Sequence, residues 1–409
     1  MVNPIVIVGG SISGLMQALQ LRRDGKDVII LEQDPDPERS SNGYGMSYMA
    51  TADSFIQEHD HSGRPAGYSS PGIRFAFGRW NNLISVRKPM TVTSWGYLYR
   101  ILRANLDGYV SIAVPNPPAL PVGHGKCDYH AGKRVTAMRE LKDTVVVEYV
   151  DVTNGQKEMI KTDLVIGADG SNSTVRDLVG APFSNEYSGY VVWRGVVKES
   201  EVSETTRQYF ASGVSLDLMW RGYILCYRIP TDQGNFGPEE ALLNYCLYEN
   251  IAEDSTTMRE ILTDTMGTVH QHVVPKGAVR TEVWDRVRVE HIPYLAPPFV
   301  ELLSKTDQPY LSKISDGMCD SPRHFGGKVY LIGNAFSTIR PHTGAASEQS
   351  AVHVKLMAKL RDGELTPEEW EQSMRARSQS FLLAARATGE FGQSSIFTFA
   401  RHLYAYARI

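Results

Sequence analysis

The residues best placed to do chemistry form a short glycine-rich turn near the start of the chain. The turn Gly9-Gly10-Ser11-Ile12-Ser13-Gly14 follows the β-branched run Ile5–Val8 and precedes apolar residues at helical spacing. A second β-branched run, Val28–Leu31, ends at Glu32. A strand, a glycine turn, a helix, a second strand and an acid in this order form the fingerprint of a dinucleotide-binding unit. Taken alone, the turn leaves open the alternative of an ordinary glycine-rich turn in an α/β protein.

The residues of this unit have physical roles in such a site. Gly9 permits the tight turn, and Gly14 lets the helix and the strand pack closely. A pyrophosphate would lie on the free N–H groups of the helix N-terminus. Ser11 replaces the second glycine of the pattern, and its small side chain still allows a ligand to approach the backbone. Glu32, with Gln33 beside it, is placed to accept hydrogen bonds from the ribose hydroxyls of the nucleotide.

Two later motifs indicate which dinucleotide is bound. The segment 163–176 is a short apolar strand that leads into Gly167-Ala168-Asp169-Gly170. The segment 328–335 is a second such strand, followed by Arg340-Pro341-His342-Thr343-Gly344 and a helical stretch. In order and spacing, the three blocks resemble the flavoprotein aromatic hydroxylases related to 4-hydroxybenzoate hydroxylase, over most of the chain. Trp193-Arg194-Gly195 adds a resemblance to the 2,6-dihydroxypyridine 3-hydroxylase-like branch.

The resemblance implies FAD as the cofactor and suggests its contacts. Asp169 would hold the loop over the flavin, and the helix that begins near Gly344 would direct its positive end at the ring. Asn334 stands where the family has an aspartate that binds the ribityl chain, so this hydrogen bond lacks charge assistance. Trp95 stands where relatives often carry arginine, so Arg100 is expected to contact the flavin instead. The residues expected at FAD are Gly9, Gly10, Ser11, Ile12, Ser13, Gly14, Glu32, Gln33, Tyr44, Gly45, Met46, Arg100, Asp169, Asn334, Gly344 and Ala345.

The middle of the chain is expected to bind the substrate. Eight aromatic residues stand between positions 187 and 227, and period-two alternation predicts an antiparallel sheet there. Tyr223 and Tyr227 fall on one face of that sheet, where aromatic rings would line an apolar pocket for a planar molecule. Ordinary core packing is the alternative for any single ring. The residues expected to contact the substrate are Trp193, Tyr209, Trp220, Tyr223, Tyr227 and His342.

These patterns predict an α/β fold with an α+β substrate part. The FAD-binding part is expected to be of the Rossmann type and discontinuous, over residues 1–73, 92–187 and 286–361. Residues 74–91 and 188–285 are expected to form the antiparallel substrate-binding sheet. Residues 362–409 are expected to be helical, with an amphipathic helix over 366–388.

The chemistry that the resemblance implies is oxygenation by an FAD-dependent monooxygenase that uses NADH or NADPH and O₂. A flavin hydroperoxide would transfer oxygen to a small electron-rich aromatic or heteroaromatic substrate. Pro341 would face the flavin ring, and His342 would act as base or substrate anchor. Two alternatives stay open. One is a flavin-fold protein that has lost oxygen transfer, either a cofactor-binding scaffold or a catalyst of a non-redox rearrangement; the other is an FAD-dependent oxidase or reductase.

Composition and charge narrow the range of partners and locations. The chain has 409 residues, of which 42% are hydrophobic and 22% charged, as in ordinary globular proteins. Its net charge of −4 argues against nucleic acid as a partner, and the lack of a long apolar run argues against a membrane span. Cys127 lies between His124 and His130, but a second ligand pair at metal-binding spacing is missing, so no metal is expected. The sequence shows no targeting segment, so we expect a cytoplasmic monomer or homodimer.

Overall fold

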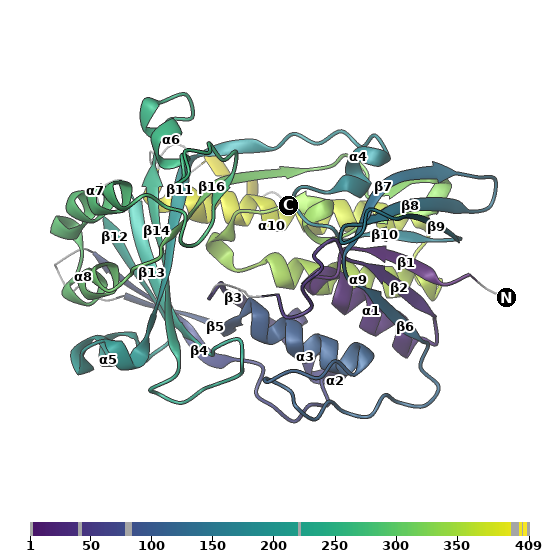
Figure 1. Cartoon of the computed structure of the whole chain (residues 1–409), viewed down its shortest axis with the longest axis horizontal. Coiled ribbons are helices and arrows are strands. Elements are labelled where there is room, and N and C mark those ends of the chain that lie inside the picture. The colour runs from purple at the N-terminus through teal and green to yellow at the C-terminus, as the bar shows by residue number, and fades with distance from the viewer. Residues whose placement is uncertain are drawn as a thin grey trace.

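A six-stranded sheet forms one end of the molecule (Figure 1). The computed structural model describes residues 3–39, 43–77, 84–219, 222–393, 401–402 and 404–406. The strand order is β17-β18-β10-β1-β2-β6, and within it only β17 runs antiparallel to its neighbour. The strands are β1 (Ile5–Val8), β2 (Val28–Leu31), β6 (Cys127–His130), β10 (Val165–Gly167), β17 (Arg323–His324) and β18 (Val329–Leu331). The β-branched residues of β1 are fully buried or nearly so, which explains why this run lies at the centre of the sheet.

Helices on this sheet complete the predicted strand–turn–helix–strand unit. Helix α1 starts directly after the glycine turn and packs against both α3 and α9. Together with β1, β2 and β10 these helices enclose the largest hydrophobic core. The helices of this part are α1 (Ile12–Arg23), α2 (Ala50–His59), α3 (Trp95–Asp107), α4 (Thr174–Leu178) and α9 (Ala346–Arg361). A separate three-stranded sheet consists of β7 (Lys133–Glu140), β8 (Val145–Asp151) and β9 (Lys157–Thr162).

A larger, mainly antiparallel sheet forms the other end of the molecule (Figure 1). Its order is β15-β16-β11-β14-β13-β12-β4-β5-β3, with β19 paired to β16, and β12 runs parallel to β4. The strands are β3 (Gly45–Tyr48), β4 (Tyr68–Phe77), β5 (Ile84–Ser94), β11 (Glu186–Lys198), β12 (Val214–Met219), β13 (Gly222–Ile229), β14 (Leu242–Asn250), β15 (Val273–Val274), β16 (Tyr310–Met318) and β19 (Ser337–Thr338).

The two faces of this sheet have different roles, because successive side chains alternate between them. The front face carries Tyr223, Leu225 and Tyr227 in one apolar cluster, as the alternation predicted. The back face carries Trp193 and Ile224 in another cluster, which includes residues of the helices beyond it. Those helices are α5 (Glu204–Phe210), α6 (Thr256–Ile261), α7 (Thr281–His291) and α8 (Pro297–Ser304).

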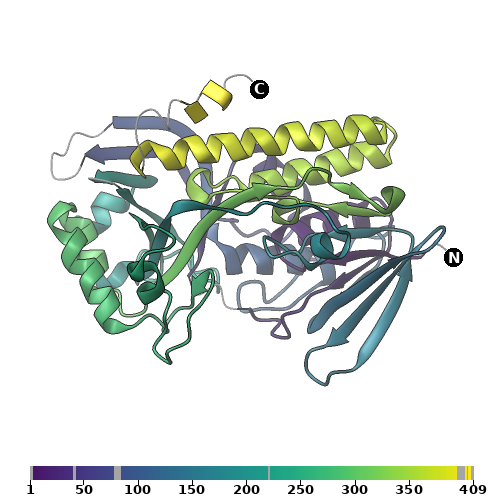
Figure 2. The same ribbon diagram turned by 90° about the horizontal axis from the view of Figure 1, so that it is seen from above.

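The long helix α10 (Pro367–Gln393) joins the two ends of the molecule. Figure 2 shows it in yellow, extending from the region of α9 to the larger sheet. It begins where the sequence predicted an amphipathic helix, and its described part continues past the expected end at residue 388 to Gln393. Among the residues that the structure describes, no helix has both the length and the apolar character that a membrane span requires.

The chain thus has the α/β fold with a separate antiparallel sheet and C-terminal helices that the sequence indicated. The expected domain boundaries stay a prediction, and the larger sheet extends beyond them. Strand β16 belongs to this sheet, although residues 310–318 lie in a segment expected to bind FAD. Helices α7 and α8 also pack on its back face, because their apolar residues Val283, Trp284 and Phe299 need a cover that this face supplies.

Asp217, in β12, is a carboxyl group buried on the back face, and its replacement tests how much the burial of this group costs in stability. The Tyr209 hydroxyl donates a hydrogen bond to its Oδ1 at 3.1 Å, yet burial raises the pKa of Asp217 to about 6. As the pH rises from about 4 to 6, the unfolded chain loses a proton that the folded chain retains, so the fold loses stability. Asp217→Asn should therefore stabilise the protein by about 2–3 kcal/mol at pH 7 and have little effect at pH 4. Urea unfolding at both pH values measures this, and a pH-independent effect would contradict it.

Candidate active site

A cavity of about 460 Å³ lies where the carboxyl ends of the parallel strands face the front of the larger sheet. The ends of β1, β2 and β10 contribute one side through Gly9, Glu32 and Asp169. The sheet contributes the opposite side, which is mostly apolar and includes Leu216 and Leu225. The carboxyl edge of such a parallel sheet is the usual ligand site of doubly wound folds.

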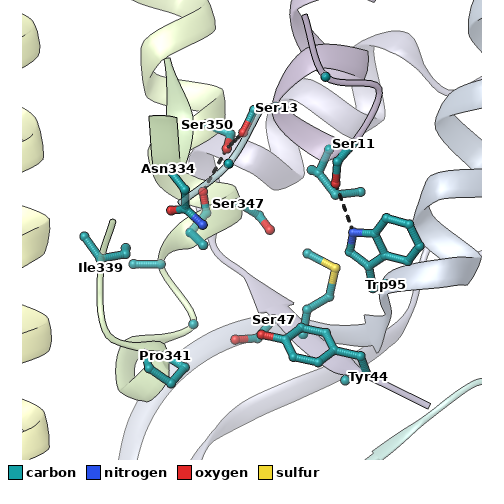
Figure 3. A pocket seen from close by; sticks show the side chains of 18 of the residues that line it. Ser11, Ser13, Tyr44, Ser47, Trp95, Asn334, Ile339, Pro341, Ser347 and Ser350 are labelled. Carbon is teal, nitrogen blue, oxygen red and sulfur yellow. Dashed lines mark hydrogen bonds between the residues drawn. The ribbon is translucent and has the colours of Figure 1, made fainter. Parts of the chain in front are cut away.

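The glycine turn leaves space that any larger residue would fill. Gly9 has a φ of +103°, and a Cβ atom there would lie 2.5 Å from the carbonyl oxygen of Ala168. A Cβ atom on Gly14 would lie 2.0 Å from the carbonyl oxygen of Gly9. The Ser11 side chain does not cap helix α1, and its hydroxyl accepts a hydrogen bond from the indole nitrogen of Trp95 at 3.2 Å (Figure 3). The first N–H groups of α1 are therefore free to bind an anionic ligand.

Glu32 lines the cavity, and protein groups already bind its carboxylate. The backbone N–H of Gly10 donates to Glu32 Oε2 at 2.8 Å, and the N–H of Asp34 donates to Oε1 at 2.9 Å. Arg39 forms an ion pair with Glu32 at 3.2 Å, and its guanidinium lies 5.0 Å from the Trp95 ring. These bonds fix the carboxylate at the end of β2, and its remaining lone pairs are available to ribose hydroxyls. Binding of the ribose by Glu32 stays a prediction.

A second open helix end, that of α9, faces the middle of the cavity. Gly344 has a φ of +64° and leads through Ala345 into α9, whose start lacks a side-chain cap. The hydroxyls of Ser13 and Ser350 lie 2.6 Å apart and join the starts of α1 and α9 (Figure 3). Asn334 lies beside them, and its buried Oδ1 has no hydrogen-bond partner within the described residues. An unpaired buried acceptor next to two positive helix ends suits a ligand with hydroxyl donors and negative charge.

Three residues expected at FAD, at and just before the start of β3, also line the cavity. Tyr44, Gly45 and Met46 line it directly, and the N–H of Gly45 donates to the side chain of Asn244 at 3.2 Å. On the other side, Asp169 lines the cavity and holds its own loop. It accepts a hydrogen bond from the N–H of Val175 at 3.0 Å, while burial raises its pKa.

Together these features fit FAD. The glycine turn would hold the pyrophosphate, Asn334 would accept a hydrogen bond from the ribityl chain, and the start of α9 would face the electron-accepting ring. Of the residues expected at FAD, those that line the cavity are Gly9, Ser11, Ile12, Ser13, Glu32, Gln33, Tyr44, Gly45, Met46, Asp169, Asn334, Gly344 and Ala345. Gly10 and Gly14 support the turn from behind, where a Cβ atom would meet Tyr129 and Gly9 respectively.

Arg100, which was expected to contact the flavin, lies away from the cavity. Its side chain donates to the carbonyl oxygen of Gly96 at 2.9 Å and forms an ion pair with Glu38 at 3.1 Å. Arg100 does not line the cavity, whereas Trp95, at the start of the same helix, does. Five positions separate the two residues, so the helix directs their side chains to different surroundings.

Two of the residues expected to contact the substrate lie away from the cavity. Trp193 lies on the back face, where its indole nitrogen donates to Glu249 and its ring contacts Trp284. Tyr209 lies on the same face, against Phe299 of α8. The aromatic content of the segment does not reveal which face each ring occupies. Trp220 lies outside the described residues.

The cavity wall instead includes Tyr227, His342, Arg194 and Tyr248, of which His342 lies in the 3-10 turn Pro341–Thr343 and the other three lie on the front face of the sheet. The sequence pointed to the first two and missed the others. Arg194 directly follows Trp193, so the alternation that turns Trp193 to the back face turns Arg194 to the front. Counting the alternation of side chains from Tyr223 across the paired strands places Arg194 on the front face. That count requires the pairing of β11 with β14 and of β14 with β13, which the sequence alone does not give.

His342 is fully engaged at both ring nitrogens. Nε2 lies 2.6 Å from the Tyr190 hydroxyl, and Nδ1 contacts the Tyr223 hydroxyl. Burial, with a contribution from Arg340, lowers the pKa of His342 well below its ordinary value, so the ring is neutral. Arg340 donates to the oxygen of Tyr190 at 3.2 Å, which favours donation by the Tyr190 hydroxyl to Nε2 and a proton on Nδ1. Tyr223 itself does not line the cavity, but it supports the histidine that does.

Buried ion pairs hold the segment that carries Pro341 and His342. Arg340 pairs with Asp316 of β16 at 2.7 Å and with Glu390 of α10 at 2.8 Å. Asp316 also pairs with Arg386 of α10 at 2.8 Å. The larger sheet and the C-terminal helix thereby fix the position of Pro341 and His342 at the cavity wall.

The variant Asn334→Asp tests whether the unpaired Oδ1 of Asn334 binds FAD. A carboxylate would accept the hydrogen bond of a ribityl hydroxyl with charge assistance, so we expect FAD to bind about 10-fold more tightly. Without FAD the same charge is buried and unpaired, so the apoprotein should melt at a lower temperature. Fluorescence titration of the apoprotein with FAD measures the affinity, with Asn334→Ala as the matched weakening variant. Equal affinity in all three proteins would contradict the assignment.

Comparisons with known proteins agree with this geometry. Models described as an FAD binding domain and as FAD binding domain-like match residues 122–216 and 187–316. The chain is 27% identical to 2,6-dihydroxypyridine 3-monooxygenase of Paenarthrobacter nicotinovorans, over 92% of this chain and 88% of that protein. The structure of 2,6-dihydroxypyridine-3-hydroxylase from Arthrobacter nicotinovorans matches with a TM-score of 0.75 and 26% identity, and covers 95% of this chain and 91% of its own.

A salicylate hydroxylase in complex with its substrate shares the fold, with a TM-score of 0.68 at 18% identity over 99% of this chain and 93% of its own. The same conclusion follows from these relatives and from three features of the cavity: the glycine turn, the unpaired Oδ1 of Asn334 and the uncapped start of α9. Along most of its length the chain is similar to FAD-dependent aromatic hydroxylases, which are flavoprotein monooxygenases.

Proposed function

We propose that the protein uses NADH or NADPH and O₂ to hydroxylate, or otherwise oxygenate, a small electron-rich aromatic or heteroaromatic substrate. The observation that carries the proposal is the cavity itself, in which the FAD-binding turn and the start of α9 face an apolar sheet wall. The relative that matches along most of the chain is a monooxygenase of a dihydroxylated heteroaromatic ring. FAD, when bound, supplies the electron transfer and the activation of oxygen.

The residues of the chain contribute binding, orientation and proton control. The glycine turn and α1 hold the nucleotide end, and the start of α9 favours negative charge at the ring. The front of the larger sheet excludes water from the substrate and packs against its plane. His342, neutral and bonded to two tyrosine hydroxyls, lines the cavity and would hold or accept a proton of the substrate. Pro341 would pack beside the flavin.

Purification and turnover test the proposal. The purified protein should be yellow and contain FAD, and an aromatic substrate should stimulate both NAD(P)H oxidation and O₂ uptake, with an oxygenated product. Suitable first probes are 2,6-dihydroxypyridine and salicylate, which the relatives suggest. A colourless protein that FAD does not reconstitute would contradict the proposal, as would NAD(P)H oxidation without an oxygenated product for any substrate in a broad aromatic panel.

The proposal includes a cytoplasmic location and a monomeric or homodimeric state, with the aromatic substrate and O₂ as the small-molecule partners. All four cysteines are free in the structure, as expected in a reducing compartment. Size-exclusion chromatography with light scattering measures the oligomeric state.

A further inference from the structure

Cys246 is a thiol in the wall of the cavity. It lies in β14 on the front of the larger sheet, and only 3% of its surface is exposed. In the antiparallel pairing it stands directly opposite Arg194 of β11 and Leu225 of β13. All four cysteines of the chain lie within the described residues and are free, and Cys246 is the one that lines the cavity. A molecule that packs on this part of the wall therefore meets a soft nucleophile.

An unpaired donor beside the thiol indicates that a ligand reaches this part of the wall. Arg194 also lines the cavity, 5% of its surface is exposed, and its Nε has no hydrogen-bond partner within the described residues. A buried donor without a partner costs free energy, which a polar ligand would recover. Residues directly opposite each other in an antiparallel pair have Cβ atoms about 5 Å apart. A ligand that approaches the guanidinium therefore comes within reach of the Cys246 sulfur.

The charge of Arg194 also acts on the thiol. Burial raises the pKa of Cys246, and the positive charge of Arg194 acts in the opposite direction. The thiolate is the reactive form of cysteine, and a neighbouring cation favours it. A ligand held against the sulfur also reacts at a high effective concentration, which offsets a low fraction of thiolate.

Cys226 provides an internal comparison, because it lies in the adjacent strand on the opposite face. It follows Leu225 in β13, and alternation turns its side chain to the back of the sheet. There it packs, fully buried, in the apolar cluster that contains Trp193. Burial raises the pKa of Cys226 well above its ordinary value, and this thiol does not line the cavity. The two thiols are therefore both buried but differ in their access to the cavity.

The apolar wall and the proposed activity indicate which electrophile the thiol meets. Hydroxylation of a ring that already carries a hydroxyl group gives a dihydroxylated product. When the two hydroxyls are ortho or para, the product loses two electrons and two protons to O₂, which gives a quinone and H₂O₂. The quinone keeps the planar shape of the substrate, so it fits the same wall of Leu216 and Leu225. Unlike the substrate, it has ring carbons that accept a thiolate.

We propose that Cys246 is a modification site for quinones that form from the product. The sulfur adds to a ring carbon of a quinone in the cavity, and its electron pair forms the new S–C bond. The thiol proton and the hydrogen of that carbon pass to the two ring oxygens, so the ring becomes a substituted hydroquinone. The adduct fills the substrate side of the cavity, and the enzyme stops as quinone accumulates. The inference rests on the proposed function for the source of the quinone.

Added 1,4-benzoquinone tests the site on the purified FAD-loaded protein. The protein is treated with an equimolar amount of the quinone, and peptide mapping by mass spectrometry gives the rate of adduct formation at each cysteine. We expect Cys246 to react at least about 10-fold faster than Cys226, and also faster than the partly exposed Cys127. In urea, where the cavity is lost, the thiols should react at similar rates. Substrate-dependent O₂ uptake should fall in proportion to the adduct at Cys246.

Variants of the two thiols show whether the adduct causes the inactivation. Quinone treatment should leave Cys246→Ala and Cys246→Ser at the O₂ uptake of their own untreated samples, whereas the wild type loses its uptake. Cys226→Ala is the matched control, because loss of the back-face thiol should change neither the adduct at Cys246 nor the inactivation. The inference would be overturned by a wild-type peptide map in which Cys246 reacts no faster than Cys226. Equal inactivation of Cys246→Ala and the wild type would also overturn it.

FAD content and product analysis separate this inference from the proposed function. An enzyme that oxygenates aromatic rings, and whose Cys246 does not react with added quinone, would overturn the inference and leave the proposed function intact. A colourless protein that FAD does not reconstitute would contradict the proposed function and, with it, the source of the quinone.

Discussion

Replacing Gly14 by alanine should destabilise the protein by about 3 kcal/mol and weaken FAD binding at least about 100-fold. The new Cβ atom would lie 2.0 Å from the carbonyl oxygen of Gly9. That oxygen belongs to the backbone of the turn, so α1 must move away from β1 to relieve the contact. Alanine favours helix over glycine by about 1 kcal/mol, but this gain is smaller than the cost of the contact.

Two measurements and one control check this prediction. The FAD content of the purified variant and its urea unfolding curve give the loss of cofactor and of stability. Gly237→Ala is the control, because its Cβ atom would meet only the Glu240 carboxylate, at 3.6 Å, and its stability should change by less than about 0.5 kcal/mol. A Gly14→Ala variant that keeps FAD and stability would show that the turn is not the cofactor site.

His342→Gln should reduce the rate of substrate oxygenation about 100-fold while FAD stays bound. Glutamine retains one donor and one acceptor for Tyr190 and Tyr223, but it cannot accept and release a proton in the pH range of the enzyme. Because burial holds the pKa of His342 far below its ordinary value, the imidazole is neutral, and its Nε2 is the nitrogen that accepts the hydrogen bond of Tyr190. NAD(P)H oxidation that continues without an oxygenated product would be the expected signature.

His353→Gln is the matched control for that variant. His353 is also buried, and burial lowers its pKa to about 3. Its Nδ1 accepts a hydrogen bond from the N–H of Gly333 at 2.9 Å, and its Nε2 lies 2.9 Å from the Ser378 hydroxyl, outside the cavity. This variant should lose stability and keep its product yield. If His342→Gln instead oxygenated its substrate at the wild-type rate, His342 would have only a structural role.

The sequence predicted those parts of the site in which a short run of neighbouring residues itself forms the binding feature. The glycine turn, β1, β2 and the strand before Asp169 combine a β-branched run with a turn that only small residues can form. These signals are short-range, so neighbouring residues suffice to recognise them. The start of α9 was found in the same way, from Gly344 and the helical spacing after it.

The remaining parts depend on contacts between distant segments. Trp193 and Arg194 differ by one position, and the pairing of β11 with β14 and β16 decides which of them faces the cavity. The engagement of both nitrogens of His342 likewise depends on two tyrosines more than a hundred residues away. Arg100 lies away from the cavity because the segment that carries Glu38 binds it, and a helical pattern contains no information about that segment.

The order of strands in the parallel sheet has a consequence for how the protein folds. Val6 of β1 pairs with Val165 of β10, which in turn pairs with Val329 of β18. The pairing of β1 with β10 and the pairing of β10 with β18 therefore each close a loop of more than 150 residues before the sheet is complete. Such non-local pairing is slow. The FAD cavity combines residues from 8 to 350 and forms only when these loops have closed. Cofactor capture is thus a late step in folding, and bound FAD stabilises all of these segments together through mass action.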